Sequence, residues 1–186
     1  MLINISKIKN GLTIKINNNY YKIISFLHVK PGKGNAFVRT KIKNLINGKI
    51  NNKNFPSGFK INYIKLISIK YLFLYKTNEN FIFINKENFS QIILSKNFIG
   101  NKKKFIKKND TVIINFIKGK NKPLYLTIKK YVILKVIKDD IKVNNNSNKK
   151  SIVETGLSIY TPLFIKIGDY IKINTKTKKY IERIKL

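Results

Sequence analysis

Short runs of β-branched and aromatic residues alternate with polar clusters along almost the whole chain, a pattern typical of β-strands joined by turns. The apolar runs are rich in Ile, Val, Tyr and Phe, and clusters of Gly, Asn, Asp and Lys interrupt them at hairpin-like intervals. Only residues 86–94 and 95–106 have the spacing and length of short helices. Many short strands with this punctuation favour an all-β chain of small barrels over a parallel α/β sheet. Strands are expected at residues 13–16, 20–26, 63–69, 71–75, 81–84, 111–116, 131–137, 157–160 and 170–174.

One interruption, Pro31-Gly32-Lys33-Gly34, places a lysine between two strand-like segments. Proline fixes its own φ near the value of a turn, and the two glycines permit positive φ and remove side-chain bulk on both sides of Lys33. We therefore predict a hairpin whose tip carries Lys33 as the working residue. Most turns of this composition are simply solvated, so these residues alone leave that alternative open. A P-loop is excluded, because no glycine-rich segment ends in Gly-Lys-Ser/Thr.

The charge balance predicts a polyanionic partner. The chain carries 39 Lys and Arg residues against 8 Asp and Glu residues, a formal net charge of +31 over 186 residues, which favours RNA binding by counterion release. Only Arg39 and Arg183 are arginines, and Lys, Asn and Ile abound. These three amino acids have A/T-rich codons, so we expect drift in base composition to account for part of the lysine count. Most individual lysines are then a solvated surface.

Other features exclude whole classes of function. The chain has no cysteine and a single histidine, His28, which rules out a disulfide framework, a histidine metal cluster and a catalytic triad. Glu154, Asp169 and Glu182 are scattered acids without the spacing of a paired-carboxylate site. No apolar run reaches the roughly 20 residues that span a bilayer, and the N-terminus lacks a signal sequence. We expect a soluble cytoplasmic protein without metal, cofactor or membrane association.

Four segments, in order along the chain, carry a resemblance to bacterial elongation factor P. Residues 29–49 read VKPGKGNAFVRTKIKNLINGK and resemble the Pro-Gly-Lys-Gly loop and following strand of its first domain. Residues 55–58, Phe-Pro-Ser-Gly, resemble a Phe-x-Ser-Gly turn, and residues 74–91 resemble a run in the second domain. Residues 154–184 are similar to a C-terminal signature of Thr-Gly, Pro-Leu-Phe, Gly-Asp and Tyr-x-x-Arg. Several motifs in the right order are far more specific than any one.

The resemblance implies a fold of three small β-barrels with a tRNA-like overall shape. An N-terminal SH3-like (KOW-type) barrel would occupy residues 1–65, and two OB-type barrels would occupy residues 66–127 and 128–186. The polar run at residues 144–150 would be a loop inside the third domain rather than a linker.

The resemblance also implies a non-enzymatic translation elongation factor. It would bind both ribosomal subunits between the P and E sites and direct the Lys33 loop toward the CCA end of peptidyl-tRNA, promoting peptide-bond formation at consecutive prolines. Lys33 matches a position that many members modify, which implies a lysine-modifying enzyme as a partner, and we expect a monomer. Pro31, Gly32 and Gly34 would shape the loop. The residues expected to contact tRNA or rRNA are Lys30, Arg39, Lys41, Tyr180 and Arg183.

Three departures from the family pattern limit this transfer. Residues 143–147, Val-Asn-Asn-Asn-Ser, replace a Gly-Asp-Thr-type loop, which puts recognition of the E-site codon region in doubt. Lys129 and Lys130 stand where prolines are expected between the second and third domains, so we expect a less rigid junction. Thr161 replaces the valine of a Val-Pro pair, a milder change.

Judged by residue type alone, Tyr180 is a core aromatic and Arg183 a solvated terminal charge.

Two functions of other classes stay open at this point. A general single-stranded RNA-binding or RNA-chaperone protein would explain the charge and the strands, with Tyr71, Phe73 and Phe81 stacking on bases. An enzyme with Lys33 as a Schiff-base lysine fits poorly, because such lysines are usually buried and Lys33 is expected at an exposed tip.

Overall fold

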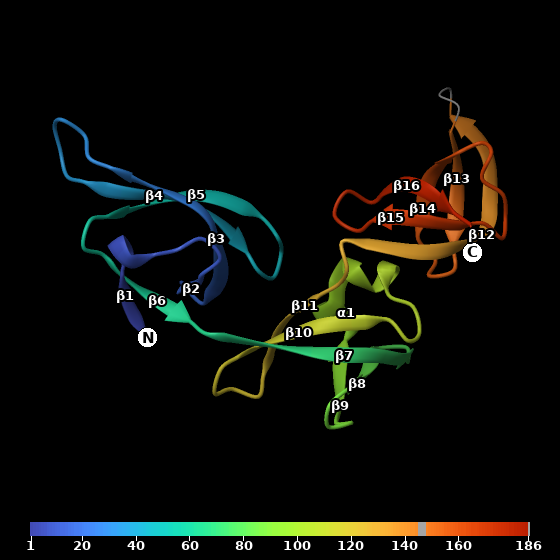
Figure 1. Ribbon diagram of the computed structural model, residues 1–186, viewed down its shortest axis with the longest axis horizontal. Coiled ribbons are helices and arrows are strands. Elements are labelled where there is room, and N and C mark those ends of the chain that lie inside the picture. Colours follow the sequence, from blue (N-terminus) through green and yellow to red (C-terminus); the bar gives the residue numbers. More distant parts are fainter. Residues whose placement is uncertain (145–147, 186) are drawn as a thin grey trace. The chain divides into compact units, whose positions relative to one another are not determined.

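The computed structural model describes residues 1–144 and 148–185, and it is built almost entirely of antiparallel strands in three sheets (Figure 1). By its internal contacts the chain divides into two compact units. One comprises residues 1–68 and 115–125, and the other comprises residues 69–114 and 126–186. The expected all-β architecture is confirmed.

The first sheet is held by alternation of buried and exposed positions. On β4, Val38, Thr40 and Ile42 are buried, whereas Arg39 and Lys41 between them are exposed. The inward side chains join an aliphatic and aromatic core, so this sheet is curled around one packed face. The strands are β1 (Leu2–Asn4), β2 (Thr13–Ile16), β3 (Asn19–Val29), β4 (Phe37–Asn44), β5 (Ile50–Pro56) and β6 (Lys60–Ile64), in the order β1-β6-β2-β3-β4-β5, with a 3-10 turn η1 (Ile5–Lys7) after β1.

The second sheet has the order β11-β10-β7-β8-β9 and a core rich in phenylalanine. Phe73 on one strand lies 5.3 Å, centroid to centroid, from both Phe81 and Phe83 on its neighbour. All three rings are buried, and Phe83 is fully so. The strands are β7 (Leu66–Lys76), β8 (Asn80–Asn85), β9 (Gln91–Ser95), β10 (Thr111–Ile117) and β11 (Pro123–Thr127).

The predicted helix at residues 86–94 is wrong. The segment begins as a turn, in which the Asn85 side chain accepts a hydrogen bond from the backbone N–H of Glu87 at 2.8 Å. Phe89 then adopts a φ of 56°, and residues 91–95 form β9 against β8. Side-chain hydrogen bonds to the nearby backbone compete with a helix. In the residues that follow, 92–94, more buried and more exposed positions alternate as they do in a strand.

The second predicted helix, at residues 95–106, is confirmed in part. Ser95 caps a single turn, α1 (Lys96–Ile99), by accepting a hydrogen bond from the N–H of Phe98 at 3.3 Å. Gly100, at a φ of 59°, then ends the α-helix, and the chain continues as the 3-10 helix η2 (Gly100–Phe105). Two short turns therefore replace one longer helix.

The third sheet has the order β14-β13-β12-β15-β16. Its core contains Leu134, Val136, Ile171 and Ile173, each fully buried. The loop expected at residues 144–150 is wrong for the part that the structure describes, because Asn144 ends β12 and residues 148–150 begin β13, where Asn144 pairs with Asn148. Residues 145–147 lie outside the described residues. The strands are β12 (Tyr131–Asn144), β13 (Asn148–Val153), β14 (Ser158–Pro162), β15 (Tyr170–Asn174) and β16 (Lys179–Ile184).

The segments that lead from the second sheet into the third are held by specific contacts. Phe105, at the end of η2, is 3% exposed and belongs to the core of the third sheet. The Thr155 hydroxyl donates to the carbonyl of Lys104 at 2.6 Å. The Thr175 hydroxyl lies 2.9 and 3.1 Å from the carbonyls of Lys129 and Lys130. The two Thr175 hydrogen bonds fix the backbone at Lys129 and Lys130, which stand where prolines were expected.

Candidate nucleic-acid interface

The hairpin of β3 and β4 positions Lys33. The two strands are paired from Tyr21 and Asn44 to Val29 and Phe37, and residues 30–36 form the loop between them. Figure 1 shows this loop projecting beyond the body of the first sheet. Every residue from 30 to 35 is exposed. The predicted placement of Lys33 at an exposed hairpin tip is therefore what the structure shows.

The two glycines beside Lys33 have different roles. Gly34 has a φ of +102°, which side chains of L-residues rarely adopt, whereas Gly32 lies outside that region. A Cβ atom added at Gly32 would meet nothing within 4 Å, and one at Gly34 would lie 4.0 Å from Cγ of Pro31. Both glycines permit positive φ, as expected, but of the two only Gly34 adopts it.

This difference predicts opposite outcomes for two matched substitutions. Gly34→Ala forces a residue with a Cβ into a region that costs on the order of 1–3 kcal/mol, so the exposed loop should adopt a different shape. Gly32→Ala should leave the loop unchanged. Amide chemical shifts of residues 30–36 measure this directly. Equal disturbance by both substitutions would contradict the assignment of the strained position to Gly34.

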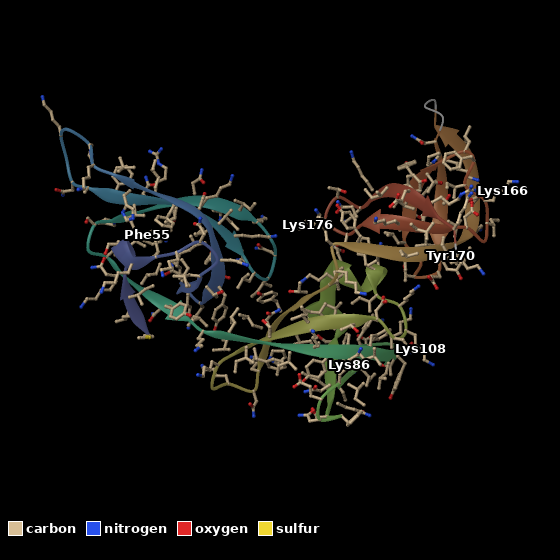
Figure 2. The ribbon with its side chains drawn as sticks, viewed as in Figure 1. Phe55, Lys86, Lys108, Lys166, Tyr170 and Lys176 are labelled. Atoms are coloured by element: carbon tan, nitrogen blue, oxygen red, sulfur yellow. The ribbon has the colours of Figure 1, made fainter. Side chains whose placement is uncertain are left out.

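The Phe-Pro-Ser-Gly turn supports the base of the Lys33 loop. The N–H of Ser57 donates to the carbonyl of Ala36, the last loop residue, at 2.9 Å. Just inside this bond, Phe55 (labelled in Figure 2) is paired with Val38 and buried, and its ring lies 5.4 Å from that of Phe59. The motif therefore has a physical role here, because it fixes the point from which the loop leaves the sheet.

Basic residues continue from the loop along the outer face of β4. Lys30 is exposed at the start of the loop, and Arg39 and Lys41 are exposed on β4. The guanidinium carbon of Arg39 lies 5.9 Å from the centroid of the Phe37 ring, on the same face. The structure thus brings Lys30, Arg39 and Lys41 onto the hairpin that carries Lys33.

No acidic residue offsets this charge in the first unit. Every Asp and Glu of the sequence lies at Glu79 or later, and none falls within residues 115–125. The unit made of residues 1–68 and 115–125 therefore contains no carboxylate side chain. Total net charge conceals this asymmetry, which the positions of the acidic residues along the sequence would have revealed. An RNA phosphate approaching this unit meets no repelling side chain.

Tyr180 and Arg183, on β16, belong to the other unit. Tyr180 is half-buried and packs against the third core, as expected of a core aromatic. Arg183 is not merely solvated, because its Nη1 lies 3.6 Å from Oδ2 of Asp169 and its Cζ lies 5.9 Å from the Phe164 centroid. The Pro-Leu-Phe, Gly-Asp and Tyr-x-x-Arg parts of the signature therefore meet around one guanidinium group.

The raised pKa of Tyr180 predicts that the folded protein loses stability in alkali. Burial raises the pKa of its phenol above the ordinary value of 10.0, and a hydrogen bond with the Arg183 backbone opposes this in part. The unfolded chain therefore loses the phenolic proton first, so the stabilisation is complete below pH 10 and is lost as pH rises through the folded-state pKa. The raised pKa values of Tyr71 and Tyr125, both caused mainly by burial, act in the same direction.

We expect the free energy of unfolding to fall above about pH 10, and Tyr180→Phe to make this fall less steep. Melting temperatures of both proteins, measured across that range, test the expectation. Tyr75→Phe is a suitable control, because Tyr75 is 56% exposed. An unchanged alkaline slope in Tyr180→Phe would show that this phenol does not contribute.

The structure does not support base stacking on the second sheet. Tyr71, Phe73 and Phe81, the expected stacking residues of a general RNA-binding protein, are 6%, 5% and 3% exposed. Rings buried in this way cannot stack on bases. Within the described residues, no group of His, Asp and Glu side chains could hold a metal ion, and no helix is long and apolar enough to cross a membrane.

Comparison with known families accounts for nearly the whole chain. A profile described as the elongation factor P (EF-P) KOW-like domain matches residues 4–61, one described as the EF-P OB domain matches residues 66–124, and one described as elongation factor P, C-terminal, matches residues 132–183. The chain belongs to the elongation factor P family. It is thus a translation elongation factor, and the family implies the ribosome as its partner.

Individual relatives agree over the full length. Elongation factor P of Flavobacterium psychrophilum is 43% identical over 184 residues, which cover 97% of this chain and 98% of that one. The protein of the same name from onion yellows phytoplasma is 41% identical over 187 residues, covering 98% of both chains. The resemblance inferred from the motifs is confirmed.

Solved structures of two more distant proteins share the fold. Eukaryotic translation initiation factor 5A from Methanococcus jannaschii matches with a TM-score of 0.52 at 16% identity, covering 68% of this chain and 93% of that one. A translation initiation factor eif-5a family protein from Naegleria fowleri matches with a TM-score of 0.55 at 16% identity, covering 69% and 98%. The expected KOW-like and OB architecture is thereby confirmed.

Proposed function

We propose that this elongation factor binds the ribosome between the P and E sites and positions peptidyl-tRNA through the Lys33 loop. One observation carries the proposal: a projecting loop presents an exposed lysine from a unit that contains no carboxylate side chain. A narrow, glycine-flanked tip can enter a confined site, and its cation attracts the backbone of the tRNA acceptor end.

Peptide-bond formation at consecutive prolines is the step that this positioning of peptidyl-tRNA accelerates most. Proline attacks through a secondary amine on a rigid ring, so few arrangements of donor and acceptor are productive. A lysine that orders the acceptor end reduces the entropy lost in reaching the attack geometry. Lys33 is exposed, whereas lysines that act as nucleophiles are usually buried, which supports a positional role and a non-enzymatic factor.

The remaining residues have supporting roles. Lys30, Arg39 and Lys41 contact phosphates along the hairpin, Gly34 and Pro31 set the shape of the tip, and Gly32 removes side-chain bulk beside Lys33. Arg183, held by Asp169 and Phe164, contacts ribosomal RNA or tRNA near the small subunit, beside Tyr180. Lys33 is the residue on which a lysine-modifying enzyme would act. We place the domain boundaries near residues 65 and 127, and we propose that the factor acts as a monomer.

A reconstituted translation system tests the proposal. We expect the protein to accelerate synthesis through a Pro-Pro-Pro sequence and to have little effect on a template of the same length without prolines. A general RNA chaperone would instead bind free single strands tightly and lose activity gradually as many different lysines are replaced. Absence of any proline-specific stimulation would refute the proposed function.

A further inference from the structure

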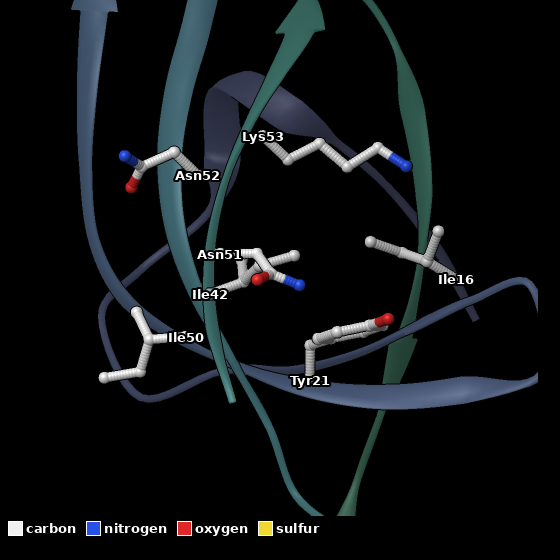
Figure 3. Close-up of a pocket in the computed structure, with 7 residues that line it drawn as sticks. All are labelled: Ile16, Tyr21, Ile42, Ile50, Asn51, Asn52 and Lys53. Carbon is white, nitrogen blue, oxygen red and sulfur yellow. The ribbon is translucent and has the colours of Figure 1, made fainter. Parts of the chain in front are cut away.

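An open pocket of about 550 Å³ lies in the first sheet, at the end of β3 and β4 away from the Lys33 loop. It is formed where the end of β2 and the start of β3 face the end of β4 and the edge strand β5. This volume falls within the range of about 300–1,000 Å³ found for small-molecule sites. The residues that line it are Ile16, Tyr21, Ile42, Ile50, Asn51, Asn52 and Lys53 (Figure 3).

The strand register determines which polar groups face the pocket. Asn51 is paired with the buried Ile42, and Lys53 is paired with the buried Thr40, so both project to the inner face. Figure 3 agrees, because Asn51 and Lys53 extend toward the side of Ile16 and Tyr21, whereas Asn52 points the other way. An amide and an ammonium group therefore share a pocket with aliphatic walls and one aromatic ring.

These polar groups are available to a ligand. Within the described part of the chain, the side-chain amides of Asn51 and Asn52 make no hydrogen bond. Lys53 Nζ lies 5.5 Å from the Phe55 ring, and none of the ion pairs between described residues includes it. Since this unit contains no carboxylate side chain, the pocket favours an anion and disfavours a metal ion or an amine.

We propose that this pocket binds an unpaired ribonucleotide of an RNA strand. The Tyr21 ring and the aliphatic walls suit the face of a base, since bases of single-stranded RNA commonly stack on aromatic side chains. The Asn51 amide has both a donor and an acceptor for the edge of the base. Lys53, at the same pocket, meets the phosphate. A purely apolar ligand would leave these polar groups without partners.

The site is separate from the Lys33 loop, and the inference goes beyond the proposed function. It gives the factor a second point of attachment to RNA, at the opposite end of the same hairpin. Because binding is measured directly, its success or failure is independent of any effect of Lys33 on translation through prolines.

Titration of the full-length, isotope-labelled protein with uridine and adenosine monophosphates tests the proposal by NMR. We expect saturable shifts of the Asn51 side-chain amide and of the backbone amides at residues 16, 21 and 50–53. A single-stranded pentaribonucleotide should bind the same residues more tightly than the mononucleotides, and a blunt RNA duplex should leave them unchanged. The last two ligands distinguish a nucleotide within a strand from a free nucleotide.

Two substitutions on one strand provide a matched control. Asn51→Asp removes the amide donor and places a negative charge in the pocket, so we expect affinity to fall by about tenfold or more. Asn54→Asp makes the same charge change three positions along, at an exposed site opposite Arg39 on the outer face, and should change affinity by less than about twofold. Lys53→Ala should weaken binding and lower its salt dependence by about one phosphate contact.

Several results would overturn the proposal. They are the absence of saturable shifts at the pocket, shifts confined to residues 30–41, or equal weakening by Asn51→Asp and Asn54→Asp. Binding of an acidic peptide at these residues in preference to the pentaribonucleotide would assign the pocket to a protein partner instead.

Discussion

Replacing Lys33 by alanine should reduce the acceleration of Pro-Pro-Pro synthesis to near the level without the factor. The side chain is exposed at the loop tip and contributes nothing to the core of its sheet, so the folded structure should be unchanged. What is lost is the cation that orders the acceptor end of the tRNA. Each tenfold in rate corresponds to about 1.4 kcal/mol, and positional effects of this kind reach several times that value. We therefore expect a loss of about tenfold or more in the proline-specific rate.

Lys49→Ala is the matched control for this substitution. Lys49 is exposed in the loop at the other end of β4, so its replacement removes the same charge from the same unit without touching the tip. It should retain the stimulation, and both variants should melt like the parent protein. Equal activity of Lys33→Ala and the parent, or an equal loss in Lys49→Ala, would show that general charge rather than the tip position is responsible.

The chemical state of Lys33 enters the same experiment. Mass spectrometry of protein from its native source shows whether this lysine carries an adduct, which would lengthen the reach of the tip. If it does, the modified protein should exceed the unmodified protein on the Pro-Pro-Pro template and should equal it on the template without prolines. Gly34→Ala should reduce stimulation as well, because it alters the loop that carries the lysine, whereas Gly32→Ala should not.

Sequence patterns predicted those features that depend on neighbouring residues. The Pro-Gly-Lys-Gly punctuation between two apolar runs was sufficient to predict a hairpin with Lys33 at its tip, and β-branched composition was sufficient to predict an all-β chain. The failures arose where a local pattern was compatible with two structures. Residues 91–95 have apolar positions that fit a short helix, and pairing with β8 makes them a strand. The local sequence alone does not determine that pairing.

The candidate sites show the same division. Gly34 and Gly32 look equivalent in the sequence, and only backbone geometry assigns the positive φ to Gly34. The pocket could not be predicted, because Asn51 and Lys53 face Ile16 and Tyr21 only through the curling of the sheet. In the third sheet, likewise, the sequence left Asp169 among scattered acids, and only the folded chain places Phe164 and Asp169 beside Arg183.

Phe105→Ala should be the most destabilising single substitution at the junction of the second and third sheets. Phe105 ends a 3-10 helix that follows β9, yet its ring is 3% exposed within the core formed by Leu134, Ile171 and Ile173. Truncating a buried phenylalanine to alanine typically costs about 3–5 kcal/mol, through lost burial and the cavity left behind. We expect this cost as a lower melting temperature and as faster hydrogen exchange at the amides of β12 and β15.

Phe89→Ala is the matched control, because it removes the same aromatic ring from an exposed position and so shows whether the loss of stability comes from lost burial. Phe89 lies in the same unit and is 74% exposed, so its replacement should change stability by less than about 0.5 kcal/mol. The contrast also tests what holds the junction in a chain that has Lys129 and Lys130 in place of prolines. If Phe105 is the anchor, its removal should speed exchange in η2 and in the third sheet together, while the first sheet stays protected. Faster exchange confined to η2 would mean that the third core closes without this ring, and the hydrogen bonds of Thr155 and Thr175 would then be the principal connection.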